Sequence, residues 1–248
     1  MLNIAHRQHL VQLLKKHNLW AKKDFGQNYL VDENILLDIV EGANITSDDT
    51  VLEIGPGPGA LTQKLCSKAD SVTALELDRE TIPVLTDTDS CGSFENLTVH
   101  QQDALLYTPE WKDYKVVANI PYYITGKILR YYIGEVENKP KSLTMLMQKE
   151  VVDKIVTSKN ESALSLFCKA FGDVSIIRMV PPEAFHPAPK VTSAVFHIDI
   201  FPQPKIQNIS IEEYSDILDK LFIAPRKQIH NNITQGLGLD TQKAKELL

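Results

Sequence analysis

Short apolar runs alternate along the chain with segments in which apolar residues recur at helical spacing. The short runs predict strands, and the helically spaced segments predict helices. Strands are expected at residues 50–54, 71–75, 97–100, 114–118, 142–147, 174–179 and 194–200. Helices are expected at residues 4–18, 32–42, 60–68, 79–86, 124–133 and 161–171. This alternation predicts βαβ units around a mainly parallel sheet, an α/β fold, whose last two strands pair as a hairpin.

A linker is expected after the last strand, at Pro202 and Pro204. Beyond it, two segments have helical patterns but are too short to enclose a core, residues 211–223 and 241–248. We therefore expect two domains, a large one with a basic N-terminal arm over residues 1–201 and a small helical one over residues 202–248.

The apolar and cysteine content narrows the class of protein further. No run of 18 apolar residues is present, so neither a membrane-spanning helix nor a membrane partner is expected. The three cysteines are scattered without C-x-x-C spacing, so we expect no metal site and no disulfide framework; they are Cys66, Cys91 and Cys168. This cysteine usage predicts a reducing, cytoplasmic location. We also expect a monomer.

Charge is distributed unevenly along the chain. The net charge is -6, which is unexpected for a protein that binds nucleic acid. Residues 1–30, however, have a net charge of +4, which leaves -10 for the remainder. A basic arm on an acidic body is one way to approach a polyanion, and a solvated helix face is an equally weighted alternative. The candidate phosphate contacts in this arm are Lys15, Lys16, Lys22 and Lys23.

A glycine- and proline-rich loop follows the first expected strand. The sequence Gly55-Pro-Gly-Pro-Gly59-Ala60 fits the dinucleotide fingerprint G-x-G-x-x-A, and Glu76 follows where a carboxylate would hold a ribose diol. Pro56 and Pro58 lack the backbone N–H groups that the pyrophosphate of NAD needs. S-adenosylmethionine has no phosphate, so the loop favours S-adenosylmethionine over NAD as the cofactor.

Two further carboxylates lie near this loop in the expected topology. Asp103 follows the strand at residues 97–100, at the sheet edge where open α/β folds bind ligands. Its carboxylate could accept a hydrogen bond from the amino group of the cofactor's adenine. Alternatively, Glu76 caps a turn and Asp103 starts a helix. Glu53 lies inside the expected strand at residues 50–54 and is expected to support the site from behind the glycine- and proline-rich loop.

The sequence Asn119-Ile-Pro-Tyr122 predicts a site that methylates an amine. The N6 lone pair of adenine is delocalised into its ring, so two acceptors on the amine protons would stabilise the charge that develops during methyl transfer. The Asn119 side chain can be one acceptor, and the Ile120 carbonyl, held extended by Pro121, can be the other. Tyr122 offers a face for stacking of the extruded base. The alternative is an ordinary turn at the end of a strand.

A second proline-stiffened loop runs from Phe185 to Ser193. Phe185 could close the other side of the target base, or it could be a core aromatic residue. His186 and His197 lack candidate ligand partners nearby in the sequence, so we expect them to have structural roles.

Taken together, these motifs resemble those of the small-subunit rRNA adenine-N6 dimethyltransferases of the KsgA type. The resemblance covers roughly residues 20–235. It rests on Phe25-Gly-Gln-Asn-Tyr-Leu30, Glu53-Ile-Gly-Pro-Gly57, Glu76-Leu-Asp78, Gln102-Asp103-Ala104, Asn119-Ile-Pro-Tyr122, Met147-Gln-Lys-Glu-Val-Val152 and the loop from Phe185 to Ser193. It implies a seven-stranded, Rossmann-like methyltransferase domain with a small helical C-terminal domain, acting on a pre-ribosomal small subunit.

The resemblance also implies roles for individual residues. Cofactor contacts are expected from Gln27, Asn28, Leu30, Gly55, Gly57, Glu76, Leu77, Asp103, Ala104 and Asn119. Further RNA contacts are expected from Arg226 and Lys227, although Pro225 replaces one arginine of the family's basic pair. The family's C-terminal helical domain normally continues past Leu248.

Three alternatives remain open on the sequence. The macrolide-resistance methyltransferases of large-subunit rRNA share the catalytic loops, but they resemble the chain poorly at Gln148–Val152. A ribosome-assembly factor or transcription factor could keep the fold and bind without turnover. An NAD oxidoreductase is the third alternative. The pattern at Arg226–Asn232 favours the small-subunit family, and the acidic body favours a prefolded particle over a flexible strand.

Overall fold

The computed structural model describes residues 1–22, 26–224 and 229–246. At its centre is a seven-stranded sheet in the order β4-β3-β2-β5-β6-β9-β7. The strands are β2 Thr50–Ile54, β3 Ser71–Glu76, β4 Leu97–Gln101, β5 Tyr114–Ala118, β6 Ser142–Gln148, β7 Gly172–Val180 and β9 Ser193–Ile200. Strands β4, β3, β2, β5 and β6 pair in parallel with their neighbours in the sheet, and β9 pairs antiparallel with both β6 and β7. The predicted α/β class, all seven strands and the final hairpin are confirmed.

Helices cover both faces of the sheet, because neighbouring residues of each central strand point into different cores. Val51 and Val117 belong to the core under the N-terminal helices, whereas Leu52 and Val116 belong to the opposite core. The helices of the first side are α1 Arg7–Lys16, α2 Glu33–Gly42, α3 Ala60–Cys66 and α4 Ile82–Leu85. Those of the second side are α5 Thr125–Arg130, continued by a π-helical segment over Tyr131–Glu135, α6 Lys149–Val156, α7 Ala163–Phe171 and α8 Ile211–Leu221.

The parallel register brings the carboxyl ends of the central strands to one edge. Ile54 at the end of β2 lies opposite Leu75 of β3 and Ala118 of β5. The segments that follow β2, β3, β4 and β5 therefore meet at this edge, which is where open α/β sheets bind ligands. The loops identified in the sequence are thus neighbours in space.

A short antiparallel pair joins the N-terminal segment to the second proline-rich loop. Strand β1 Tyr29–Leu30 pairs with β8 Phe185–His186, and Leu30 lies opposite Phe185. This pair places the segment around Gln27 over the same edge of the sheet. It was not expected from the sequence.

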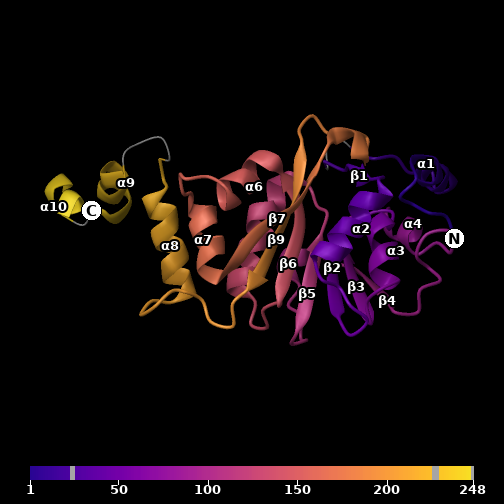
Figure 1. Cartoon of the computed structure of the whole chain (residues 1–248), viewed down its shortest axis with the longest axis horizontal. Helices are drawn as coiled ribbons and strands as arrows, with labels where there is room; N and C mark the ends of the chain where they lie inside the picture. Colours follow the sequence, from indigo (N-terminus) through magenta and orange to yellow (C-terminus); the bar gives the residue numbers. More distant parts are fainter. Residues whose placement is uncertain (23–25, 225–228, 247–248) are drawn as a thin grey trace.

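The C-terminal helices form a row at one end of the molecule, opposite α1 (Figure 1). Helix α8 packs against α7, and its Tyr214 hydroxyl donates to the Leu166 carbonyl. Beyond it, α9 Ile229–Leu237 packs on α8, and α10 Thr241–Glu246 packs on α9. Within the described ranges, no helix is long and apolar enough to cross a membrane. The division into two domains near residue 201 stays a prediction.

Candidate cofactor and catalytic site

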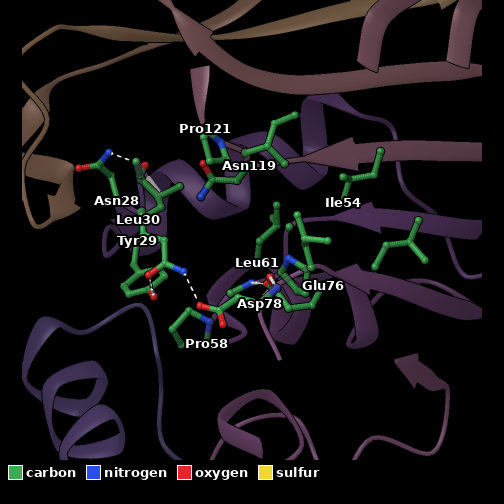
Figure 2. Close-up of a pocket in the computed structure, with 18 of the residues that line it drawn as sticks. Asn28, Tyr29, Leu30, Ile54, Pro58, Leu61, Glu76, Asp78, Asn119 and Pro121 are labelled. Carbon is green, nitrogen blue, oxygen red and sulfur yellow. Dashed lines mark hydrogen bonds between the residues drawn. The ribbon is translucent and has the colours of Figure 1, made fainter. Parts of the chain in front are cut away.

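A pocket opens at the carboxyl edge of the sheet, between the strand ends and the N-terminal segment. Figure 2 shows Asn119 and Pro121 on one side of it, Glu76 and Asp78 on another, and Asn28–Leu30 along a third. The structure brings all the predicted cofactor and catalytic residues to the wall of this pocket: Gln27, Asn28, Leu30, Gly55, Gly57, Glu76, Leu77, Asp103, Ala104, Asn119, Ile120, Pro121, Tyr122 and Phe185.

Within residues 55–59, the loop after β2, each backbone N–H is either already hydrogen-bonded or absent. Gly55 donates its N–H to the Leu75 carbonyl at 3.0 Å, and Gly59 donates to the Pro56 carbonyl at 3.1 Å. Gly57 donates to the Glu76 carboxylate at 3.1 Å. The other two residues of the loop are prolines without an N–H. A pyrophosphate uses such donors, so residues 55–59 suit S-adenosylmethionine better than NAD.

Glycine is required at position 55 because of the backbone conformation there and because the Asn119–Tyr122 loop lies so close. Gly55 has a φ of +71°, which L side chains rarely adopt. A Cβ at Gly55 would lie 2.7 Å from the Ile120 side chain and 3.2 Å from the Asn119 carbonyl oxygen. The cofactor loop and the Asn119–Tyr122 loop are therefore in direct contact.

Glu76 connects the cofactor loop to the end of β3. Its two carboxylate oxygens accept from Gly57 N at 3.1 Å and from Asp78 N at 2.8 Å. Burial raises the pKa of Glu76, and these backbone hydrogen bonds oppose the shift. Each carboxylate oxygen has a second lone pair. The carboxylate can therefore hold a ribose diol while it caps this turn, so the two interpretations of Glu76 are compatible.

Asp103 also combines its two interpretations. One carboxylate oxygen accepts from Leu105 N at 2.9 Å and so starts a 3₁₀ turn over Ala104–Leu106. The second oxygen remains available as an acceptor for an adenine amino group. The Tyr132 hydroxyl donates to the buried Ala104 carbonyl at 2.9 Å and fixes this turn against the sheet.

The N-terminal segment is fastened to the pocket by Gln27. Its amide nitrogen donates to Asp78 at 3.0 Å, and its oxygen accepts from the Lys22 backbone N–H and the Tyr29 hydroxyl, each at 2.9 Å. Gln27 thus shapes the wall that a cofactor would contact. No role for Asp78 was predicted from the sequence, although its position two residues after Glu76 was the available signal.

The loop Asn119–Tyr122 begins at the end of β5, where Asn119 N donates to the Ile54 carbonyl. Pro121 has a φ of -54° and a ψ of 138°, and a 3₁₀ turn starts at Tyr122. Phe185 contributes to the pocket wall although it is only 1% exposed and belongs to the core of the N-terminal side. The core interpretation of Phe185 therefore fits its burial, and its contact with the target base stays a prediction.

The predicted RNA-binding cations have mixed environments. Lys16 pairs with Asp87 at 2.8 Å and Asp89 at 2.9 Å, and Lys22 pairs with Asp78 and Glu80. Lys15 is exposed. Lys23, Arg226 and Lys227 lie outside the described residues. Because two of the cations already have acidic partners, fewer charges are left for phosphates than the sequence indicated.

Removing the Glu76 carboxylate is expected to weaken binding of S-adenosylmethionine. Loss of two hydrogen bonds to the ribose diol would cost roughly 1–3 kcal/mol in Glu76→Ala. Isothermal titration calorimetry of this variant and of the exposed control Glu95→Ala measures the difference. Tight binding of NAD by the parent protein, without binding of S-adenosylmethionine, would contradict this assignment of the pocket.

Glu53 is expected to make stability depend on pH. The side chain is fully buried in β2, and neither carboxylate oxygen has a hydrogen-bond partner among the described residues. Burial raises the pKa of Glu53 from 4.5 to about 8, with nearby Thr62 opposing the shift and the charge of Glu76 adding to it. Between pH 4.5 and about 8, Glu53 is protonated in the folded protein but ionised in the unfolded chain. The free energy of unfolding therefore falls as pH rises.

Glu53→Gln removes this titration. Between pH 4.5 and pH 7 the free energy of unfolding should fall by about 3 kcal/mol less in this variant than in the parent. The difference follows from a slope of about 1.4 kcal/mol per pH unit for one proton. Urea unfolding over this range measures the difference, with the exposed Glu95→Gln as the control. Parallel stability curves for Glu53→Gln and the parent would show that Glu53 is ionised in the folded state.

Comparison with known proteins identifies the family. The family model for ribosomal RNA adenine dimethylase matches residues 18–246. The Ribosomal RNA small subunit methyltransferase A of Clostridium acetobutylicum is 38% identical over 95% of this chain and 88% of its own. That of Alkaliphilus oremlandii is 35% identical over 96% of this chain and 86% of its own.

Two solved structures agree with this assignment. A dimethyladenosine transferase from Plasmodium falciparum has a TM-score of 0.72 at 29% identity, covering 83% of this chain and 74% of its own. The 23S rRNA methyltransferase ErmE has a TM-score of 0.70 at 27% identity, covering 83% of both chains. The match over nearly the whole chain, together with a pocket that fits S-adenosylmethionine, shows that this chain belongs to the ribosomal RNA adenine dimethylase family.

Proposed function

We propose that the chain transfers methyl groups from S-adenosylmethionine to the N6 atoms of adenines in small-subunit ribosomal RNA, giving N6,N6-dimethyladenosine. The observation that carries the proposal is the contact between the cofactor loop and the Asn119–Tyr122 loop. At Gly55 the two loops are so close that a single added carbon would overlap the Ile120 side chain. Acceptors for an amine therefore lie beside the pocket that fits the methyl donor.

The residues of this loop have distinct roles in the proposed reaction. The Asn119 side-chain oxygen and the Ile120 carbonyl accept hydrogen bonds from the two N6–H groups, which localises the lone pair on the nitrogen. Tyr122 stacks on the adenine, and Phe185 closes the pocket behind it. S-adenosylmethionine supplies the methyl group. No covalent intermediate is needed, because the sulfonium leaves as a neutral thioether when the N6–carbon bond forms, and N6 then releases one proton to solvent.

The choice of small-subunit RNA rests on the relatives and on the parts that differ between families. The two bacterial relatives are named for the small subunit, whereas ErmE is named for 23S rRNA. Gln148–Val152, the segment that resembles the small-subunit family, forms the end of β6 and the first turns of α6. We further propose that the chain acts as a monomer in the cytoplasm.

A preassembled particle is the proposed form of the substrate. Helix α1 and the pair α9–α10 lie at opposite ends of the long axis (Figure 1). An RNA that contacts the N-terminal arm and the C-terminal helices together must span this length. Because the body is acidic and Lys16 and Lys22 have acidic partners, shape must contribute more than charge to this docking. The distance to be spanned and the acidic body both favour a folded pre-ribosomal small subunit as the substrate.

RNA docking through the N-terminal arm is expected to depend on salt. Replacing Lys15, Lys16, Lys22 and Lys23 with glutamine should flatten the salt dependence by up to about 0.9 log unit for each phosphate that is no longer neutralised. Binding to small-subunit RNA at a series of salt concentrations measures the slope. Lys68→Gln is the control, because this exposed lysine follows α3 and is not part of the arm in the sequence. Equal salt dependence of binding in the quadruple variant and the parent would mean that the arm is a solvated helix.

Catalysis itself is tested by methyl incorporation. The parent protein, labelled S-adenosylmethionine and undermethylated small subunits should give labelled dimethyladenosine. A protein that binds these subunits without incorporation would be a binding factor on a methyltransferase fold, and the proposed function would be wrong.

A further inference from the structure

The two proline-rich loops of the site are joined by one hydrogen bond between side chains. The Tyr122 hydroxyl lies 2.6 Å from the Ser193 hydroxyl. Tyr122 belongs to the loop after β5, and Ser193 is the last residue of the second loop and the first of β9. The two residues are 71 positions apart in the sequence, so the fold creates this hydrogen bond.

Ser193 is a rigid anchor. It is fully buried, and its backbone lies between Gln148 of β6 and Val180 of β7 in the sheet. Tyr122, in contrast, lies in a one-turn 3₁₀ helix and lines the pocket. The Thr125 hydroxyl donates to the Tyr122 carbonyl at 2.9 Å and holds its backbone. The hydrogen bond with Ser193 holds the far end of its ring, which fixes the direction in which the ring faces.

We propose that Ser193 is a positioning residue for methyl transfer, whose hydroxyl holds the Tyr122 ring in the orientation that stacks on the target adenine. This inference rests on the proposed function. Because the phenol oxygen is engaged with Ser193, the adenine meets the ring face of Tyr122. Burial raises the pKa of Tyr122, so the phenol stays protonated and can act as the donor to Ser193.

A double-mutant cycle tests this role. Ser193→Ala and Tyr122→Phe each remove the same hydrogen bond, so each should slow single-turnover methyl transfer by about two- to tenfold. The double variant should be no slower than the slower single variant, because both substitutions break one and the same bond. Ser193→Thr keeps a hydroxyl and should restore most of the rate. Affinity for S-adenosylmethionine should stay unchanged in all of them, because neither Tyr122 nor Ser193 is among the predicted cofactor contacts.

Control variants separate positioning from general stability. Ser142→Ala changes another buried serine at the start of a strand, β6, at the opposite edge of the sheet, and it should keep the parent rate. If Ser193→Ala does not fold, Tyr122→Phe tests the same bond from the pocket side. Parent-like rates in Tyr122→Phe, or multiplicative losses in the double variant, would overturn the inference. Absence of methyl transfer by the parent protein would instead overturn the proposed function.

Discussion

Asn119→Ala is expected to lower the single-turnover rate of methyl transfer by a hundredfold or more. Removal of one preorganised group that stabilises developing charge typically has an effect of this size. Without the Asn119 oxygen, one N6 proton of the adenine loses its acceptor, and the lone pair stays delocalised in the ring. Affinity for S-adenosylmethionine should change less, because this acceptor faces the substrate amine. Rapid-quench measurement at saturating cofactor and RNA gives the rate.

Companion variants show whether the loss comes from this acceptor. Tyr122→Ala should also be strongly impaired, because stacking of an extruded base contributes about 1–3 kcal/mol. Tyr122→Phe keeps the ring and should be much milder. A parent-like single-turnover rate in Asn119→Ala, with intact cofactor binding, would remove Asn119 from the catalytic site.

The fold was largely predictable because its strands are apolar runs bounded by turn residues. Two predicted strands, residues 50–54 and 114–118, have the bounds seen in the structure. Helix α6 was not predicted, because it follows β6 directly and Gln148 makes no side-chain cap. Helix α9 was not predicted either; its sequence contains the Asn231-Asn232 pair and Gly236, which are weak helix formers.

The β1–β8 pair shows where sequence patterns stop being informative. Each strand has two residues, too few for any periodicity, and their partners are far apart in the chain. The pairing depends on tertiary packing of Leu30 and Phe185, which are both buried in the core of the N-terminal side. Helix–strand alternation could not show that these segments meet.

In the candidate site, too, some features were predictable from the sequence and others were not. Gly55, Glu76, Asp103 and Asn119 were predictable because parallel strands bring their carboxyl ends to one edge. The hydrogen bonds of Gln27 with Asp78 and of Tyr122 with Ser193 were not, because they join residues 51 and 71 positions apart. The ion pairs of Lys16 with Asp87 and Asp89 were not predictable either, because these residues are also far apart in the sequence.

The ribosomal subunit that the chain modifies is expected to be the small one, with almost no transfer to the large one. Both families perform the same adenine chemistry, so the catalytic loops do not distinguish them. Discrimination must come from docking, in which phosphate contacts set the register and the shape of the folded RNA gives specificity. Transfer should also be faster on an assembly-stage small subunit than on its naked RNA, because a prefolded particle presents that shape without further ordering cost.

Mapping of the methylated nucleotides is the decisive test of which ribosomal subunit the protein modifies. Undermethylated small and large subunits are incubated separately with the protein and labelled S-adenosylmethionine, and the modified positions are located by mass spectrometry of RNA fragments. Asn119→Ala provides the background. We expect N6,N6-dimethyladenosine in small-subunit rRNA and nearly none in large-subunit rRNA. Dimethyladenosine confined to large-subunit rRNA would contradict this expectation and assign the chain the activity for which ErmE is named.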